Sequence, residues 1–256
     1  MNSHTTKPEQ IISQIDQLAT IKLSVVIPAY NEEDNILLLS KEVYQALDDM
    51  AGSFELIWVD DASSDQTAHN IRNLDYPNIR SVFHHINCGQ SSAIASGFQV
   101  SRGEWVATLD GDGQNDPHDL IRMLNKAIEL EVDCVTGVRS KRKDNWLRLV
   151  SSKVANGYRN LITGDKVSDS GCGIRVVKRS ALREIPVFNG MHRFLPTLLR
   201  SQNFTVVEVP VNHRERATGE SKYGVNNRLW RGIKDCFGIR WYLSRAVISE
   251  RTCETD

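Results

Sequence analysis

The sequence predicts an α/β protein built on a mostly parallel sheet with helices on both faces. Short runs rich in β-branched residues alternate along the chain with segments whose apolar residues recur at helical spacing. Polar loops follow several of the strand-like runs and lead into the next helix, as strand–helix–strand units require. With 256 residues, of which 40% are hydrophobic and 25% charged, the chain can bury a substantial core.

The first half of the chain holds the most regular alternation. After a strand-like run, IKLSVVIP, the residues Ile36, Leu39, Val43 and Leu47 repeat at helical spacing. In order, we expect a strand at 21–28, a helix at 32–50, a strand at 54–59, a helix capped by Ser64 or Asp65, a strand at 79–83, a helix at 89–102 ended by Gly103 in the left-handed conformation, a strand at 104–109, a helix capped by Asp116 with Pro117 at its first position, and a strand at 133–138.

Beyond residue 139 the alternation is looser. We expect a helix at 146–162, a strand at 173–177, helices at 180–185 and 191–201, a strand at 204–210, and a basic amphipathic helix at 225–247 with a break near Gly238. In this last helix Leu229, Ile233, Phe237 and Trp241 recur every four residues among basic side chains. Such a helix either packs on its own domain or lies on a membrane surface. The chain divides into an extension at 1–20, a main domain at 21–224, and a C-terminal helix and tail at 225–256.

Composition indicates in which cellular compartment the protein works. No window of about eighteen residues is apolar and free of charge, and residues 1–20 lack both the basic start and the apolar run of an export signal. Five cysteines are scattered without a C-x-x-C pair, which argues against a disulfide framework and a zinc knuckle. The histidines, His84 among them, show no ligand spacing with any cysteine, so we expect structural or surface roles for them. We expect a cytoplasmic protein.

Charge is divided unequally between the two halves. Residues 1–136 carry 8 Lys and Arg against 21 Asp and Glu, a net charge of −13, whereas residues 137–256 carry 23 against 11, a net charge of +12. An acidic half usually binds an anion through a cation, and a basic half suits phosphate groups or an anionic lipid surface. The alternative is an uneven scatter of surface charge. No nucleic-acid partner is expected.

Three polar loops follow strands of the predicted sheet, and ligands of open α/β sheets bind beyond the carboxyl ends of the strands. The loops read PAYNEE at 28–33, DDASSDQT at 60–67 and DGDGQNDP at 110–117. In the third loop glycine lets Asp110 and Asp112 face one cation, and Gln114 could add an oxygen. Oxygen ligands suit Mg²⁺ or Mn²⁺, which keep substrate phosphates in their shell. A D-G-D run alone is also an ordinary turn.

A D-x-D at a strand end, with PAYNEE and DDASSD in the first two loops, resembles the GT-A fold (Rossmann-like) of nucleotide-sugar-dependent glycosyltransferases. The pattern is most similar to the inverting transferases that move a sugar onto a polyprenyl phosphate, the dolichol-phosphate mannosyltransferase-like family. The resemblance runs from Leu23 to Tyr223.

The resemblance implies a donor site for a GDP- or UDP-linked sugar. In this chain the matching residues are Pro28, Ala29, Tyr30, Asn31 and Glu32 of the first loop, Asp61 for the base, Gly89 at the start of the flanking helix, Asp110, Gly111 and Asp112 with Gln114 for the metal and pyrophosphate, and Arg214 and Lys222 of a closing loop. Asp60 is expected to support the second loop. Many relatives have lysine where Ser91 or Ser92 stands here, so the resemblance implies no charge contact from this helix.

The resemblance also implies an acceptor site. Arg139 and Arg148 look like the arginines that receive the lipid phosphate, and Arg175 ends the segment DSGCGIR at 169–175, similar to an S-G-F-R-type motif. Asp169 either acts as a catalytic base or braces its loop. A sugar hydroxyl acceptor would need that base, whereas a phosphate monoester, with a second pKa of about 6, is already an oxyanion at neutral pH.

The implied reaction is metal-dependent inverting transfer of a sugar from the nucleotide to a polyprenyl phosphate. The alternatives are a glycosyltransferase that acts on a saccharide hydroxyl and a catalytically silent domain that binds nucleotide sugars. Peripheral attachment to the inner face of a membrane is expected through the basic C-terminal helix. That helix could instead pair with a second copy of the chain.

Overall fold

The computed structural model describes residues 21–139, 146–214 and 225–246. In this part of the chain a seven-stranded sheet has the order β3-β2-β1-β4-β6-β5-β7. The strands are β1 (Leu23–Ala29), β2 (Phe54–Asp60), β3 (Ile79–Phe83), β4 (Trp105–Thr108), β5 (Cys134–Arg139), β6 (Arg175–Lys178) and β7 (Val206–Val211). The helices are α2 (Ile36–Ala46), the short 3-10 helix η1 (Asp48–Met50), α3 (Thr67–Arg72), α4 (Gln90–Val100), α5 (Asp119–Glu129), α6 (Trp146–Thr163), α7 (Arg179–Leu182), α8 (Met191–Ser201) and α9 (Val225–Leu243).

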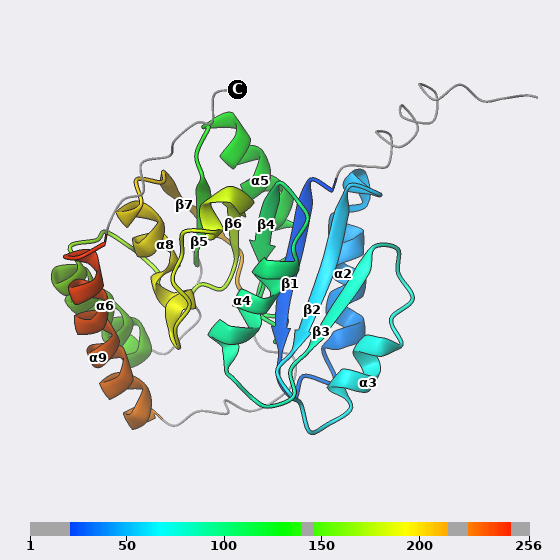
Figure 1. The fold of residues 1–256 in the computed structure, drawn as a ribbon, viewed down its shortest axis with the longest axis horizontal. Helices are drawn as coiled ribbons and strands as arrows, with labels where there is room; N and C mark the ends of the chain where they lie inside the picture. Colours follow the sequence, from blue (N-terminus) through cyan, green and yellow to red (C-terminus); the bar gives the residue numbers. More distant parts are fainter. Residues whose placement is uncertain (1–20, 140–145, 215–224, 247–256) are drawn as a thin grey trace, which may run out of the picture.

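The sheet is parallel except at one strand. β1 pairs in parallel with β2 and β4, β2 with β3, and β5 with β7, whereas β6 is antiparallel to both β4 and β5. The carboxyl ends of the parallel strands therefore meet at one edge, together with the beginning of β6 (Figure 1). The predicted mostly parallel sheet is confirmed.

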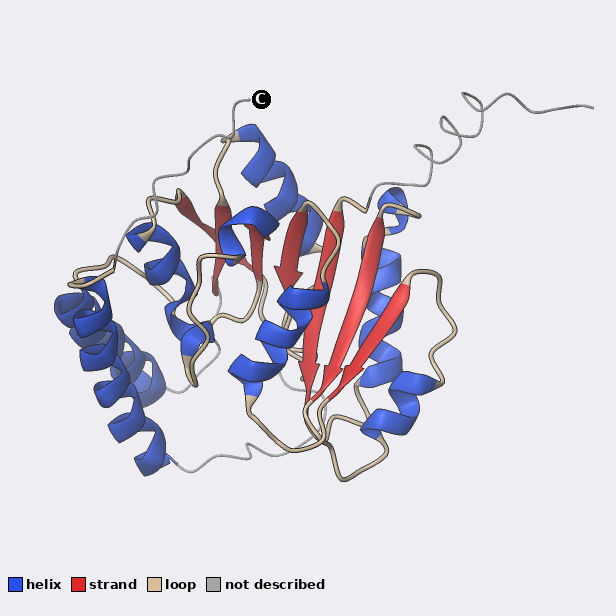
Figure 2. Ribbon diagram, in the orientation of Figure 1, coloured by secondary structure: helices blue, strands red, loops and turns tan. Residues whose placement is uncertain are grey.

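Helices cover both faces of the sheet (Figure 2). Alternate residues of β1 point to opposite faces, so Val25 and Ile27 join a core with α2, α3 and α5, while Val26 joins a second layer with α4. A third cluster, beneath α4, α7, α8 and α9, extends that second layer over β5 and β6. Each face thus has its own apolar core.

Most elements lie within a few residues of their predicted bounds, and β3 and α8 coincide with them. Gly103, however, does not end α4 in the left-handed conformation, because the helix ends at Val100 and Ser101 is extended. Gly103 is needed for close approach instead, since a Cβ there would lie 2.6 Å from the backbone nitrogen of Ser24. The cap position of α5 is His118, two residues after the predicted Asp116, but Asp116 Oδ1 does accept from the backbone nitrogen of His118 at 3.1 Å.

The C-terminal helix α9 is continuous through Gly238, so the predicted break is wrong. Cys236 and Ile239 pack into the cluster beneath α8, while Phe237 and Trp241 are 56% and 63% exposed. The side chain of Leu229 lies outside the described residues. Packing on the domain and an outward apolar stripe therefore coexist on α9, and the predicted domain boundary at 224/225 stays a prediction. Within the described ranges, no helix combines the length and apolar character that crossing a bilayer requires.

Candidate active site

The first two loops at the carboxyl edge interlock through hydrogen bonds. The backbone nitrogen of Asn31 donates to Ser63 Oγ at 2.9 Å, and Asn31 Oδ1 accepts from the backbone nitrogen of Ser64 at 2.8 Å. Asn31 adopts φ 53°, a left-handed conformation that asparagine tolerates better than most residues. Glu32 is fixed by its backbone nitrogen, which donates to Thr67 Oγ1 at 2.8 Å. Pro28 and Ala29, in contrast, are buried at the end of β1, and Tyr30 is exposed beside them.

Asp61 ties the second loop to the turn before α4. Its carboxylate accepts from the backbone nitrogens of Cys88 at 2.9 Å and Gly89 at 2.7 Å, and lies 2.7 Å from His84 Nδ1. Asp61 is 3% exposed, so these contacts replace water almost completely. Asp60 supports the loop by accepting from the backbone nitrogen of Ser63 at 3.4 Å, while its buried Oδ1 has no hydrogen-bond partner among the described atoms.

Asp110 and Asp112 stand at the end of β4. Gln90 Nε2, at the start of α4, donates to Asp110 Oδ1 at 2.9 Å, and the backbone nitrogen of Gln114 donates to Asp112 Oδ1 at 3.2 Å. Gly111 lets this loop lie on the first one, because a Cβ would come within 2.6 Å of the carbonyl oxygen of Pro28. The two aspartates are thereby placed beside the interlocked loops.

The electrostatics of this pair fit a divalent cation. The pKa of Asp110 is raised to about 6, chiefly by burial and also by the negative charge of Asp112, while the charges of Arg175 and Arg139 and the hydrogen bond from Gln90 oppose the rise. Two carboxylates that repel each other in this way gain from a cation between them, and hard oxygen ligands suit Mg²⁺ or Mn²⁺. The amide nitrogen of Gln114 donates to the carbonyl oxygen of Arg214 at 3.3 Å, so its role as a third ligand stays a prediction.

Arg139, the last residue of β5, forms a two-point ion pair with Asp169. Its Nε lies 2.6 Å from Asp169 Oδ2 and its Nη2 lies 2.7 Å from Oδ1. Burial alone would lower the pKa of Arg139, but the hydrogen bond and charge of Asp169 raise it above the ordinary value. The backbone nitrogen of Gly171 also donates to Asp169 Oδ1, at 3.2 Å. These contacts are those of a residue that braces its loop, one of the two roles predicted for Asp169.

The loop that carries Asp169 is attached to α6 by two asparagines that sequence reasoning missed. Asn160 Nδ2 donates to the carbonyl oxygen of Val167 at 3.0 Å, and its Oδ1 accepts from the backbone nitrogen of Val167 at 3.3 Å. Asn156 Nδ2 donates to the carbonyl oxygen of Ser168 at 2.9 Å. Their spacing of four residues, which places both on one helix face, is the sequence feature that could have revealed them.

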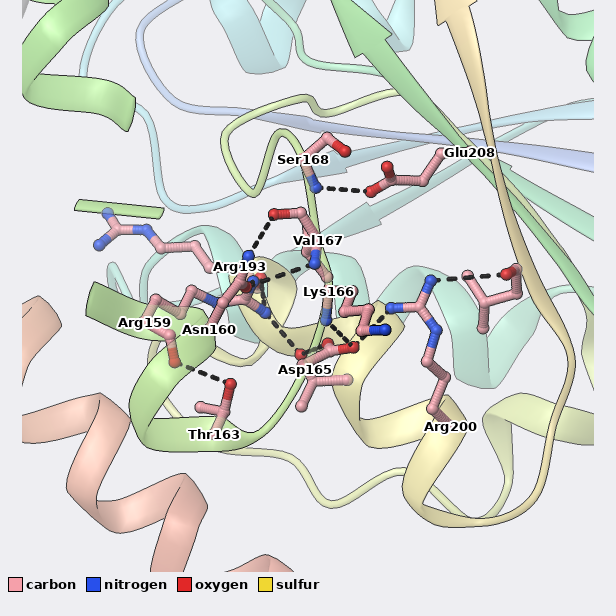
Figure 3. A network of polar contacts seen from close by, with 12 residues as sticks. Arg159, Asn160, Thr163, Asp165, Lys166, Val167, Ser168, Arg193, Arg200 and Glu208 are labelled. Carbon is pink, nitrogen blue, oxygen red and sulfur yellow. Dashed lines mark hydrogen bonds and ion pairs between the residues drawn. The ribbon is translucent and has the colours of Figure 1, made fainter. Parts of the chain in front are cut away.

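The same loop is held from its other side by α8 and β7 (Figure 3). Asp165 pairs with Arg200 at 2.7 Å and accepts from Thr197 Oγ1 at 2.5 Å. The backbone nitrogen of Ser168 donates to Glu208 Oε1 at 2.8 Å. The loop is therefore fixed on both sides before it reaches Asp169.

Two other predicted arginines have definite places. Arg175 is 3% exposed at the beginning of β6, with its Nε lacking a hydrogen-bond partner among the described atoms, and its charge acts on Asp110. Arg214 pairs with Glu42 at 2.7 Å and with Asp116 at 2.9 Å, which holds the chain after β7 against the third loop. The predicted contacts of Arg175 with acceptor and of Arg214 with donor stay predictions. Lys222 and the side chain of Arg148 lie outside the described residues.

Comparison with known proteins identifies the family of the chain. Residues 24–186 match the family model described as glycosyl transferase family 2. A curated undecaprenyl-phosphate 4-deoxy-4-formamido-L-arabinose transferase from Edwardsiella ictaluri is 38% identical over 206 residues, 79% of this chain and 63% of that protein. A dodecaprenyl-phosphate galacturonate synthase from Rhizobium johnstonii is 34% identical over 244 residues, 93% of this chain and 72% of that protein. The chain thus spans less than two thirds of the length of the first of these relatives.

Solved structures share the fold. A glucosyl-3-phosphoglycerate synthase from Mycobacterium tuberculosis, in complex with Mn²⁺, uridine diphosphate and glucosyl-3-phosphoglycerate, superposes with a TM-score of 0.61 at 19% identity, covering 91% of this chain and 86% of that one. The predicted GT-A fold is confirmed. The chain belongs to glycosyl transferase family 2.

Proposed function

We propose that the protein transfers a sugar from a nucleotide sugar to a polyprenyl phosphate. The observation that carries the proposal is that one sheet edge joins the acidic pair Asp110 and Asp112 to Arg139, whose charge acts on Asp110. An acidic pair suits a cation and a diphosphate, and an arginine suits an acceptor phosphate. The two curated relatives described above are both named for a polyprenyl phosphate, which supports this acceptor class.

At the donor end, the interlocked first and second loops offer the surface for the nucleoside, with Asp61 near the base. Asp110 and Asp112 would hold Mg²⁺ or Mn²⁺ against the pyrophosphate. The ion, when bound, stabilises negative charge that develops on the leaving nucleoside diphosphate. The Mn²⁺ in the structurally similar synthase is consistent with this assignment.

At the acceptor end, an oxygen of the lipid phosphate attacks the anomeric carbon while the bond from that carbon to the nucleoside diphosphate breaks, which inverts the centre. The acceptor needs no base because a phosphate monoester has a second pKa of about 6 and is largely ionised at neutral pH. Arg139 positions this phosphate, with Arg148 of α6 as its predicted companion. Asp169 holds Arg139 through their two-point ion pair.

The outward side of α9 supports contact with a membrane surface. Phe237 and Trp241 are exposed, and Arg245 lies over the ring of Trp241 with its guanidinium carbon 5.8 Å from the ring centroid. On the neighbouring α6, Leu161 is 79% exposed. Arg240 joins the helices by donating to the carbonyl oxygen of Ile162 at 2.9 Å. Apolar and cationic side chains on one pair of helices suit the anionic inner face of a cytoplasmic membrane.

The deciding experiment is transfer of radiolabelled sugar from a panel of GDP- and UDP-sugars, with Mg²⁺ or Mn²⁺, to an organic-extractable polyprenyl phosphate. We expect label in the organic phase, lost with EDTA and with Asp112→Ala. Label that instead enters a saccharide hydroxyl, with dependence on Asp169 as a base, would replace the lipid acceptor. Nucleotide-sugar binding without any transfer would mean a silent binding domain.

A further inference from the structure

Three side chains with different metal-binding atoms meet at the carboxyl ends of β2 and β3. Asp61 follows β2, His84 follows β3, and Cys88 lies in the turn before α4. One carboxylate oxygen, one ring nitrogen and the Cys88 sulfur all lie within 4.8 Å of one another. Over the described ranges this is the one group of three such side chains with that geometry. It was not predicted from the sequence: His84 and Cys88 are only four residues apart, but Asp61 joins them only through the fold.

The groups around these ligands already orient them. The Asp61 carboxylate is held by the backbone nitrogens of Cys88 and Gly89. His84 Nε2 lies 2.9 Å from Ser96 Oγ of α4, and a serine hydroxyl can accept a hydrogen bond from that nitrogen. With the proton on Nε2, His84 Nδ1 is left as a ligand atom. Metal-binding histidines usually have their second nitrogen fixed by such a partner.

From this arrangement we propose that Asp61, His84 and Cys88 form a site for a thiophilic divalent cation of the Zn²⁺ class. A carboxylate, a thiolate and a neutral imidazole together carry the two negative charges that balance such an ion. Ligand atoms of a tetrahedral zinc lie about 3.3–3.6 Å apart, as follows from bond lengths of about 2.0–2.3 Å. Without the ion, the 2.7 Å contact between His84 Nδ1 and Asp61 Oδ1 requires the ring proton on Nδ1. Binding of the cation therefore moves the ring proton to Nε2, releases the thiol proton of Cys88 to solvent, and widens this contact.

The chemistry of this site separates it from the Asp110 and Asp112 pair. Sulfur and imidazole ligands select Zn²⁺-like ions, whereas an all-oxygen pair suits Mg²⁺ or Mn²⁺. Cys88 is an exposed free thiol, so the ion can reach the site from solvent. The three other cysteines of the described residues are buried.

Binding at this site competes with the donor nucleotide, because a cation on Asp61 occupies the carboxylate predicted to contact the base. This part of the inference rests on the proposed function. Zn²⁺ would therefore inhibit transfer by excluding the donor, without touching the ion at Asp110 and Asp112.

Co²⁺ is the probe, because a thiolate bound to Co²⁺ gives a charge-transfer absorption that oxygen ligands alone do not give. The full chain, Cys88→Ser and the matched control Cys253→Ser are each titrated with Co²⁺. We expect a band that saturates at one equivalent in the wild type and in Cys253→Ser, and none in Cys88→Ser with an unchanged circular dichroism spectrum. No band in the wild type, or the same band in Cys88→Ser, overturns the site.

Competition is measured by repeating the titration with UDP or GDP and Mg²⁺. Saturating nucleotide should raise the apparent dissociation constant for Co²⁺ about tenfold or more, and an unchanged constant overturns the competition. The band itself requires no catalysis. A band without any sugar transfer would leave the cation site standing while the proposed function fails, and transfer without a band would overturn the cation site alone.

Discussion

The carboxylate of Asp110 lies over the Cα of Gly173, in the space where any other residue would carry its Cβ. Gly173 belongs to the segment that enters β6, and Asp110 to the loop that leaves β4, so the contact joins two neighbouring strands of opposite direction. The absence of a side chain at Gly173 is thus what allows Asp110 to take its position beside Asp112.

Gly173→Ala should displace the Asp110 carboxylate and weaken Mn²⁺ binding. Misplacement of a reacting group by about 1 Å can cost about 100-fold in rate, so we expect a loss of transfer of that order. Mn²⁺ affinity is measured by electron paramagnetic resonance, separately from activity. The matched control is Gly157→Ala on α6, where an added Cβ meets nothing within 4 Å. Wild-type Mn²⁺ affinity in Gly173→Ala would show that the contact is irrelevant.

The raised pKa of Asp110 predicts that the free energy of unfolding of the metal-free protein falls as pH rises. A carboxyl whose pKa is about 6 in the folded state, against an ordinary value of 3.8, binds its proton more tightly when folded. The fold therefore loses stability relative to Asp110→Asn as pH rises through about 4 to 6, by up to about 3 kcal/mol. Urea unfolding in EDTA at pH 4.5 and pH 7.5 measures the difference. An equal gap between the two proteins at both pH values would contradict the shift.

The ion pair of Arg139 and Asp169 predicts that the two residues act as a unit. Breaking a desolvated charge pair costs about 2 kcal/mol or more, so Arg139→Gln and Asp169→Asn should each lower kcat/KM for the acceptor about 30-fold or more. The double variant should be no worse than the poorer single one, since the second change removes a pair already broken. If the loss in the double variant equals the product of the two single losses, and kcat of Asp169→Asn no longer depends on pH, Asp169 would be a base instead.

The exposed side chains of α9 predict binding to anionic vesicles. Replacing Phe237 and Trp241 by serine removes two large apolar groups, each worth about 1.5 kcal/mol or more when buried in lipid, so binding should weaken at least about tenfold. Flotation with vesicles of anionic phospholipid is the measurement. The control replaces Leu37 and Leu38 by serine, because these are 59% and 53% exposed on α2, on the opposite face of the sheet. Unchanged flotation together with a loss of dimer would favour pairing of α9 with a second copy.

Local sequence patterns predicted the elements well, because periodicity and turn residues act within a few positions. α8 and β3 have their predicted bounds, and the three loops do lie at one edge of the sheet. The antiparallel direction of β6 could not be predicted, because an apolar run does not show whether a strand pairs in parallel or antiparallel with its neighbours. The prediction for Gly103 was wrong for a related reason. The sequence alone does not distinguish a glycine that ends a helix from one that lets a neighbouring strand pack closely.

The sequence predicted which residues of the candidate site lie near one another, but not the contacts that hold them. Asp110 and Asp112 could be found because loop position and spacing carry the signal. The partners of Asp61 are backbone nitrogens, which no side-chain motif records. Asn156 and Asn160 bind backbone groups of a segment that only the tertiary fold brings to α6.

Those two asparagines fix the position of α6 relative to the loop of Asp169. The helix is hydrogen-bonded to the loop of Asp169 through these asparagines, and near its end the side chain of Leu161 is exposed to solvent. Any surface that touches Leu161 is therefore held at a fixed distance from that loop, because Leu161 directly follows Asn160 on the same helix. On the proposed membrane surface, an acceptor phosphate would have to extend from the bilayer by that distance to react, so the reach of its headgroup, as well as its charge, would decide which lipids can serve.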